Sequence, residues 1–559
     1  RQMCIRDRSR AVINWATFDV GANASVTFVQ PGAQAAVLNR VTGASASQID
    51  GAITANGQVF FVNPNGITFG QGAQVDAAAV VASTLEISDS NFLNGTLSFS
   101  GDTKAAIVNR GRISASDANG FIALLSPVIK NAGLLEATVS PNNVIVLGSA
   151  NRINIRFSNG TLLDVAVNEA SYQNLVENTG TIKTNAGSIL IPVAAVDGLY
   201  EAAINNSGTI AADSTTTRGG LIELLAQKVV STGTISANSQ TDQGGDIRIV
   251  GTRSVDLGGT LTANSATQQG GKITVAGENV TLRAGVAVEA KGATGGGTIQ
   301  LGDVENIFRA TDLIEPVTVA SKQVVVTAGA MVDASATSAG AGGTILVQAD
   351  NANLGGRFNA DAAGSFAGGT ATIKVRDQLG LEAVGSLMMS TLGTPNGTWN
   401  ITTQQVLIKG KKPILMSELS EKQDCLDKFR DILARQYTTG SAVVLNQAAT
   451  TPSNKIDAVA PPLPPGRPRI EQTTITEDDL PEKKTSSKSS AQKRTAEASS
   501  GNRPRAASTV SDEKRGASTI STVKPPAAQS PRTSPEPTPK KPPQQTPKPG
   551  LGTSRQDPQ

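Results

Sequence analysis

Histidine is absent from all 559 residues of the chain, and only 3% of the residues are aromatic. Because histidine is the commonest general base and metal ligand, its absence excludes His-dependent catalytic triads and most zinc chemistry. The two cysteines, Cys4 and Cys425, cannot form the disulfide framework that staples small secreted domains. No apolar run is long enough to predict a transmembrane helix, and no signal peptide is visible at the start.

Charge is low and unevenly distributed. The formal net charge is +3, yet residues 452–559 contain 18 basic and 11 acidic residues, which leaves the preceding part of the chain with a net charge of −4. Domains that bind nucleic acid carry a basic face to meet the phosphates. The charge distribution therefore argues against a nucleic-acid-binding core.

Two glycine-containing phrases recur with the same period. A Gly-Gly pair followed by an alternating strand begins at Gly219, Gly244, Gly270, Gly296, Gly342 and Gly368, with spacings of 25, 26, 26, 46 and 26 residues. A Gly-Thr-Ile or Gly-Thr-Leu phrase begins at Gly180, Gly208, Gly233 and Gly259. A fixed repeat of strands predicts a β-helical solenoid with a narrow core, which small side chains can fill. The longer spacing predicts a loop insertion at residues 306–321.

The two ends of the chain differ from the repeats. Residues 1–10 are rich in charge and predict a non-native leader, with the native export signal missing from the sequence. Residues 411–451 predict a helical cap, in which Ser420 and Gln423 form a capping box and Cys425 lies on the buried face. Residues 452–559 hold 19 of the 27 prolines and no aromatic residue, and they predict a disordered tail.

One stretch near the start is more specific than composition. It contains Leu38-Asn39-Arg40-Val41, Ile49-Asp50-Gly51, the run from Ala55 to Ile67 (ANGQVFFVNPNGI), and Phe69-Gly70. These residues resemble the haemagglutination-activity, or two-partner secretion, domain of the filamentous haemagglutinin family. The resemblance covers residues 11 to 100 strongly and the later repeats only in style.

The resemblance implies an all-β, right-handed parallel β-helix. Residues 11–175 would form the secretion domain, truncated at its start, and residues 176–410 the repeat shaft. A dedicated outer-membrane β-barrel transporter would recognise the secretion domain in the periplasm and deliver the protein to the cell surface or the medium. The candidate recognition residues are Asn39, Arg40, Asn63, Pro64, Asn65 and Gly66. The last four also fit a plain type I turn, so a purely structural role stays open, and either role keeps the turn at the surface.

The sequence offers no catalytic, cofactor-binding or metal site. Asp and Glu are scattered, and Trp15 and Trp399 lie far apart, whereas polysaccharide-cleaving enzymes need clustered carboxylates and often aromatic platforms. We therefore expect a secreted or surface-exposed adhesin or haemagglutinin-like protein with an unknown receptor. A ligand carrier exported by the same route, or a β-helical polysaccharide lyase or hydrolase, are the alternatives.

Overall fold

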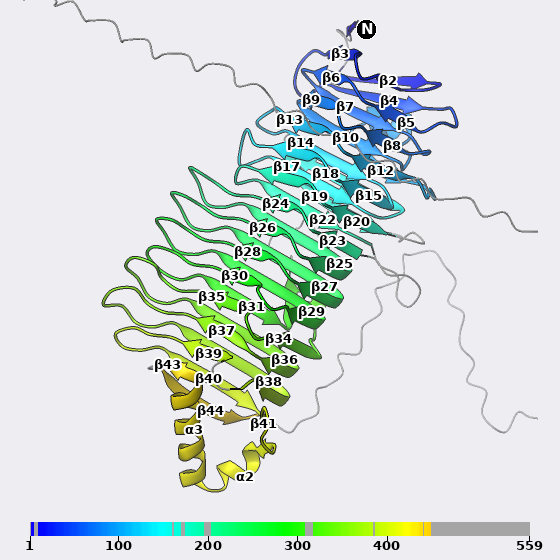
Figure 1. Ribbon diagram of the computed structural model, residues 1–559. Coiled ribbons are helices and arrows are strands. Elements are labelled where there is room, and N and C mark those ends of the chain that lie inside the picture. The colour runs from blue at the N-terminus through cyan, green and yellow to red at the C-terminus, as the bar shows by residue number, and fades with distance from the viewer. Residues whose placement is uncertain are drawn as a thin grey trace, which may run out of the picture. The chain divides into compact units, whose positions relative to one another are not determined.

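The computed structural model describes residues 2–4, 9–158, 161–168, 174–194, 203–307, 317–383, 386–439 and 441–448. The predicted disordered tail lies outside these residues. Within them, the chain winds into coils that stack along one axis (Figure 1). Strands of successive coils pair in parallel and build two long sheets.

A 15-stranded sheet holds one short strand from each coil. Its members are β1 (Gln2–Cys4), β3 (Ser25–Val29), β6 (Ala52–Ala55), β9 (Gln74–Ala77), β13 (Arg112–Ala115), β16 (Leu134–Ala137), β21 (Thr181–Thr184), β24 (Thr209–Ala211), β26 (Thr234–Ser236), β28 (Thr260–Thr262), β30 (Ala287–Glu289), β35 (Met331–Asp333), β37 (Gly356–Asn359), β39 (Leu387–Ser390) and β43 (Thr438–Thr439). The predicted non-native leader thus contains β1, which pairs with β3.

A 24-stranded sheet forms the rest of the coil wall. Its members are β2 (Arg10–Trp15), β4 (Ala36–Val41), β5 (Ser47–Ile49), β7 (Gln58–Val62), β8 (Ile67–Phe69), β10 (Ala79–Ser83), β12 (Ala106–Asn109), β14 (Phe121–Leu125), β15 (Val128–Asn131), β17 (Val144–Gly148), β20 (Leu175–Asn178), β22 (Ser188–Pro192), β23 (Ala203–Asn206), β25 (Leu221–Ser231), β27 (Asp246–Leu257), β29 (Lys272–Leu282), β31 (Thr298–Gly302), β34 (Gln323–Val326), β36 (Thr344–Leu354), β38 (Thr370–Leu381), β40 (Thr398–Thr403), β41 (Gln405–Ile408), β42 (Ile414–Leu415) and β44 (Ala442–Gln447). In several later coils a single long strand takes the place of two short strands such as β22 and β23; these long strands are β25, β27, β29, β36 and β38.

Two kinds of ladder hold the coils in register. Inside, apolar side chains stack from coil to coil, as in the fully buried series Ile182, Ile210, Ile235, Leu261, Val288 and Val332. At a bend, buried amides form a second ladder: each Nδ2 donates to the next oxygen along Asn109, Asn131, Asn178, Asn206 and Ser231, at 2.7 to 3.0 Å. The predicted all-β, parallel β-helical class is confirmed.

The Gly-Gly pairs mark corners where neighbouring coils approach closely. A Cβ atom on Gly245 would lie 2.2 Å from the carbonyl oxygen of Gly220, and one on Gly271 would lie 2.0 Å from that of Gly245. Any larger residue would push the coils apart there. Close backbone approach explains why the pair recurs once per coil.

The 46-residue spacing contains an antiparallel hairpin of β32 (Val304–Ile307) and β33 (Val317–Val319). Val304 and Val319 pack with Val250 and Ala276 on the outer face of the 24-stranded sheet. Arg376 binds the carboxylates of Asp303 and Asp350 at the base of the hairpin. The hydrogen bonds to Asp303, and then those to Asp350, outweigh desolvation and raise the pKa of Arg376.

Helices α2 (Met416–Ser420) and α3 (Gln423–Tyr437) follow the last full coil, and α3 buries Phe429, Leu433 and Tyr437. The predicted capping box is wrong, because Ser420 ends α2 and the residue before α3 is Lys422, which makes no side-chain cap. The predicted burial of Cys425 is also wrong, since its side chain is exposed. The first turn of α3, which holds Cys425, projects beyond the last strands (Figure 1).

Candidate functional site

The turn Asn63–Gly66 connects β7 to β8 and is held by its own side chains. The backbone N–H of Gly66 donates to the carbonyl of Asn63 at 3.0 Å, as the type I turn requires. Asn63 is 1% exposed, and its Nδ2 donates to Ser47 Oγ at 3.0 Å. Gly66 has a φ of +113°, a conformation that side chains resist. The expectation that the turn lies at the surface is therefore wrong for Asn63.

Asn65 is the exposed residue of this turn, and Pro64 is partly exposed. The Asn65 side chain donates from Nδ2 to the carbonyl of Gly43 at 2.8 Å and to Asn63 Oδ1 at 3.1 Å. The carbonyl of Pro64 accepts from Thr103 Oγ1 at 2.7 Å. Of the four predicted turn residues, Asn65 is thus the one that presents its side chain most openly to a partner.

Asn39 and Arg40, the other two candidates, are engaged inside the fold. Asn39 is 1% exposed and accepts from Trp15 Nε1 at 3.1 Å. The Arg40 guanidinium binds the Asp89 carboxylate and the Ile87 carbonyl, and its side chain is 14% exposed. Asn39 therefore fixes the first coils, and Arg40 holds the segment that begins α1 (Asp89–Leu93).

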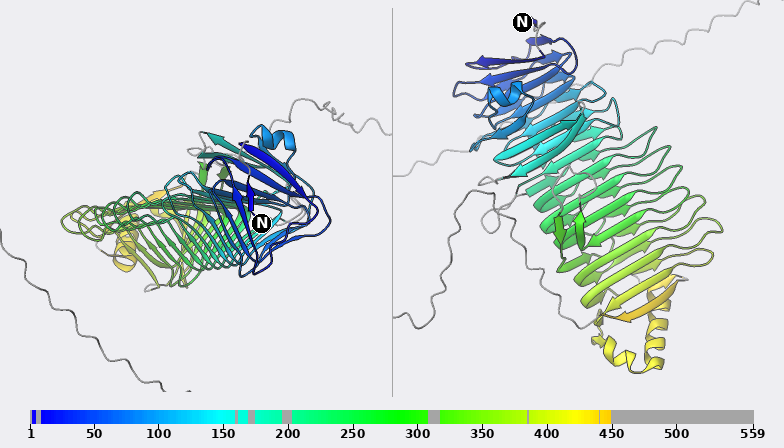
Figure 2. Two further views of the ribbon diagram at one scale, coloured as in Figure 1. Left: turned by 90° about the horizontal axis from the view of Figure 1, so that it is seen from above. Right: turned by 180° about the vertical axis from the view of Figure 1, so that it is seen from behind.

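An antiparallel three-stranded sheet and α1 cover the outer face of the first coils (Figure 2). The sheet contains β11 (Leu97–Ser100), β18 (Arg152–Ser158) and β19 (Thr161–Asn168). Phe92 of α1 packs against Phe60 of β7 with ring centroids 5.1 Å apart. Under this cover, the strands β7, β10, β14 and β17 are buried at every residue. We call α1 and the three strands the outer cover.

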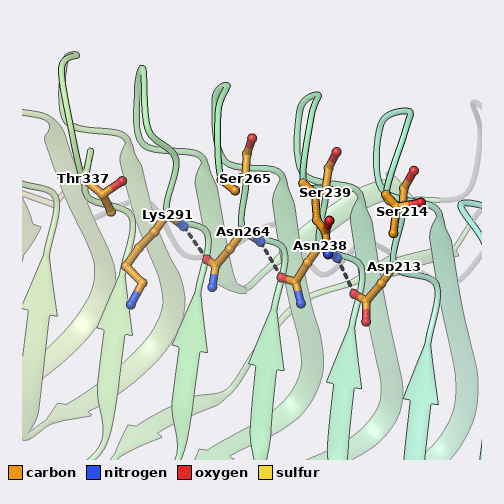
Figure 3. Close-up of a pocket in the computed structure, with 11 residues that line it drawn as sticks. Asp213, Ser214, Asn238, Ser239, Asn264, Ser265, Lys291 and Thr337 are labelled. Atoms are coloured by element: carbon orange, nitrogen blue, oxygen red, sulfur yellow. Dashed lines mark hydrogen bonds between the residues drawn. The ribbon is translucent and has the colours of Figure 1, made fainter. Parts of the chain in front are cut away.

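A groove follows the corner after β24, β26, β28, β30 and β35 and has a volume of about 440 Å³. Its floor is a ladder in which side-chain oxygens bind the backbone of the next coil. Asp213 Oδ1 accepts from the N–H of Asn238 at 2.6 Å, Asn238 Oδ1 from that of Asn264 at 2.8 Å, and Asn264 Oδ1 from that of Lys291 at 2.7 Å (Figure 3). Ser214, Ser239, Ser265 and Thr337 lie nearer the overhanging loops (Figure 3). We call this feature the comb groove.

The described residues include no group of three or more Cys, Asp or Glu side chains placed to hold a metal ion. Charged side chains there pair mostly between coils, as in Arg112 and Lys183 on Glu136 and Arg283 on Asp256. These ion pairs link one coil to the next. No helix among the described residues is long and apolar enough to span a membrane.

Neither the outer cover nor the comb groove was predicted. The cover had a signal, because Val59-Phe60-Phe61-Val62 is apolar without alternation, and such runs indicate a strand buried on both faces. The groove had a weaker signal in the polar residues that follow each Gly-Thr-Ile phrase.

Residues 4–249 match the family described as the TPS, or two-partner secretion, domain. The match begins within the predicted leader and extends beyond the predicted domain boundary at residue 175. A heme/hemopexin-binding protein of Haemophilus influenzae is 35% identical over 189 residues, which are 32% of this chain and 20% of that protein. A second H. influenzae heme/hemopexin-binding protein is 44% identical over 87 residues, 15% of this chain and 9% of that protein.

The alignments thus span a fifth or less of the length of either relative. The crystal structure of the HMW1 secretion domain from H. influenzae superposes with a TM-score of 0.48 at 24% identity, covering 72% of this chain and 92% of that one. The matched residues 4–249 contain the turn, the outer cover and the first coils. The chain carries a two-partner secretion domain at residues 4–249.

Proposed function

We propose that this chain is exported through its secretion domain and acts as an adhesin, in which the β-helix presents a recognition surface to a receptor. The comb groove is the observation that supports the proposal: it repeats one polar corner over five successive coils. A stacked solenoid of this kind offers an extended binding surface rather than an enclosed pocket. Such a surface suits attachment to a large partner better than turnover of a small substrate.

Export and attachment can be measured together. The full chain, preceded by a signal peptide, is co-expressed with its partner transporter, and the protein recovered from the medium is labelled and added to bacterial and host cells. We expect transporter-dependent export and saturable cell binding. Export without saturable binding to any cell type would contradict the adhesin role and leave the secretion route intact.

Transporter recognition belongs to the same proposal, and Asn65 is the residue that we assign to it. Asn65→Ala should reduce export while the purified protein stays folded, because Asn65 is exposed and Ala is compatible with the third turn position. The lost bonds from Asn65 to Gly43 and Asn63 should lower the melting temperature only slightly, since water can replace them at this exposed place. Gly66→Val is the matched structural variant, which should lower the melting temperature because of the positive φ. Normal export of a folded Asn65→Ala protein would limit the turn to a structural role.

The second candidate function is a ligand carrier, which the names of the two heme/hemopexin-binding relatives favour. The chain has no histidine, the usual proximal ligand of haem iron in globins and peroxidases. A carrier role would therefore rest on contact with a haem-carrying protein rather than on ligation of iron by histidine. Titration with haem-loaded hemopexin tests this directly, because the names of the relatives include that protein: saturable binding of the loaded hemopexin would favour the carrier over the adhesin.

An enzymatic role remains the least supported alternative. Asp303 and Asp350 share a partner, but both carboxylates bind Arg376 at the base of the hairpin rather than line the comb groove. We expect no turnover of pectin, alginate or a glycosaminoglycan. Turnover that one Asp or Glu substitution abolishes would replace the adhesin proposal with a lyase or hydrolase.

A further inference from the structure

The comb groove is close to neutral along its length. At one end, the Asp213 carboxylate accepts from the N–H of Asn238 at 2.6 Å and from Ser236 Oγ at 2.8 Å. Toward the other end, Lys291 Nζ lies 2.9 Å from the Glu289 carboxylate. The remaining lining residues carry hydroxyl, amide or methyl groups. The groove therefore offers no electrostatic potential complementary to a strongly charged ligand.

The groove keeps polar groups available after its own ladder is satisfied. Asn238 Nδ2 donates to Thr262 Oγ1 at 3.0 Å, and Asn264 Nδ2 donates to Glu289 Oε2 at 3.1 Å. Because an amide nitrogen has two hydrogens, each residue retains one N–H for a ligand. Thr215, Gln240 and Thr337 add exposed side chains. The two amides lie on neighbouring coils, and the three exposed side chains lie on the first, second and fifth coils of the groove. At a strand spacing of about 4.8 Å, five coils span about 19 Å.

An exposed aromatic ring lies on the loop next to the last groove residue. The backbones of Gly340 and Ala363 exchange two hydrogen bonds of 3.0 Å, which stack the loop after β37 on the loop after β35. Phe366 in that loop is 47% exposed, and Leu392 on the following coil is 39% exposed. An exposed aromatic ring on the loop of the coil that follows the groove offers a stacking platform for the apolar face of a sugar ring.

We propose that the comb groove, with Phe366 as its platform, binds a neutral linear polysaccharide along the axis of the coils. Hydroxyl groups of the sugars meet the amide and hydroxyl groups of the groove, and one ring stacks on Phe366. Lys291, which is paired with Glu289, is the single basic residue of the lining, too little positive charge for an anionic glycan or a nucleic acid. The lining side chains are short and mostly polar, without the large apolar residues that anchor a peptide helix. This inference rests on the proposed adhesin function and names the class of its receptor.

The test is calorimetric titration of the full chain with cellohexaose, chitohexaose and laminarihexaose, and with heparin as an anionic comparator. We expect binding of at least one neutral hexaose and none of heparin. Phe366→Ala should weaken that binding roughly three- to tenfold, as the loss of one aromatic contact implies. Phe366→Trp should preserve it. Thr215→Ala with Gln240→Ala should also weaken it, and Val139→Ala, an exposed position in the secretion domain, is the matched control.

Three outcomes would overturn the assignment: no binding of any neutral hexaose, tighter binding of heparin, or neutral-glycan binding that neither Phe366→Ala nor the Thr215 and Gln240 pair alters. The proposed function fails separately. If the exported protein binds cells but no neutral glycan, only the groove assignment is lost. If it binds neutral glycans but no cell, the groove assignment stands and the adhesin role is lost.

Discussion

The first coils and the later shaft share one winding but differ on their outer faces. In β7, β10, β14 and β17 every residue is buried, because the outer cover packs on the coil wall. In β38 of the shaft, buried and more accessible residues alternate along the first half of the strand. The same solenoid therefore supports a two-layered region, where the secretion domain begins, and a shaft that has a single layer except where the hairpin of β32 and β33 packs on Val250 and Ala276.

The comparison also shows where each region obtains its stability. The first coils gain from aromatic packing outside the coil, as between Phe60 and Phe92. The shaft relies on ladders between coils, an apolar one inside and a polar one at the corners of Asn238, Asn264 and Lys291. A substitution under the cover should thus have a local but large effect, whereas a ladder substitution should act through the contacts between neighbouring coils.

The largest effect is expected for Phe60→Ala. Phe60 is fully buried between the 24-stranded sheet and α1, and removal of such a ring costs about 3–5 kcal/mol, since a cavity remains. Phe366→Ala, at an exposed shaft position, should change stability by less than about 0.5 kcal/mol. Denaturant unfolding monitored by circular dichroism compares the two. Equal destabilisation would remove the distinction between covered and uncovered coils.

A smaller loss is expected for Asn178→Ala in the buried amide ladder. Asn178 Oδ1 accepts from Asn131 at 2.7 Å, and its Nδ2 donates to Asn206 at 2.8 Å. The substitution leaves both neighbours with an unmade hydrogen bond in a buried place, at a cost of about 1–3 kcal/mol. Asn142→Ala is the control, because Asn142 is exposed and its side chain makes one hydrogen bond, of 3.4 Å. Matching melting temperatures for both variants would show that the ladder adds no stability.

Much of the fold could be predicted from the sequence, because each coil repeats the same local requirements. Gly245 and Gly271 are needed where coils touch, and Ile210 and Ile235 point inward at the same place in successive coils. The turn at Asn63–Gly66 was also correct as a turn. These features depend on short segments and on one period.

Other features depend on contacts between distant segments and could not be read from local pattern. The outer cover pairs β11 with β18, some fifty residues later, so its antiparallel sheet has no contiguous signal. Asn63 was expected at the surface, but Ser45 and Ser47 of the preceding coil close over its side chain. Helical periodicity places Cys425 on the apolar face of its helix and therefore predicts that it is buried. Periodicity does not show how far along the helix other elements pack against that face, and the first turn, which holds Cys425, is exposed.

The smallest expected effect is the pH dependence of the ion cluster at Glu136, which joins β13, β16 and β21. Burial alone would raise the pKa of Glu136, but hydrogen bonds from Lys183 and Arg112, together with their charges, lower it below its ordinary value. A carboxylate whose folded pKa is depressed stabilises the fold above its unfolded pKa, and this stabilisation is lost as pH falls through the folded value. The cluster should therefore contribute at neutral pH and progressively less below about pH 4.3, the ordinary Glu value. Glu136→Gln should lower the melting temperature at pH 7 and leave it nearly unchanged at pH 2.5. The control is Glu382→Gln, which removes an exposed ion pair with Lys409 in the shaft. It should have little effect on the melting temperature at either pH, since exposed pairs contribute little stability. A Glu136→Gln deficit that is equal at both pH values would assign the loss to packing rather than to charge.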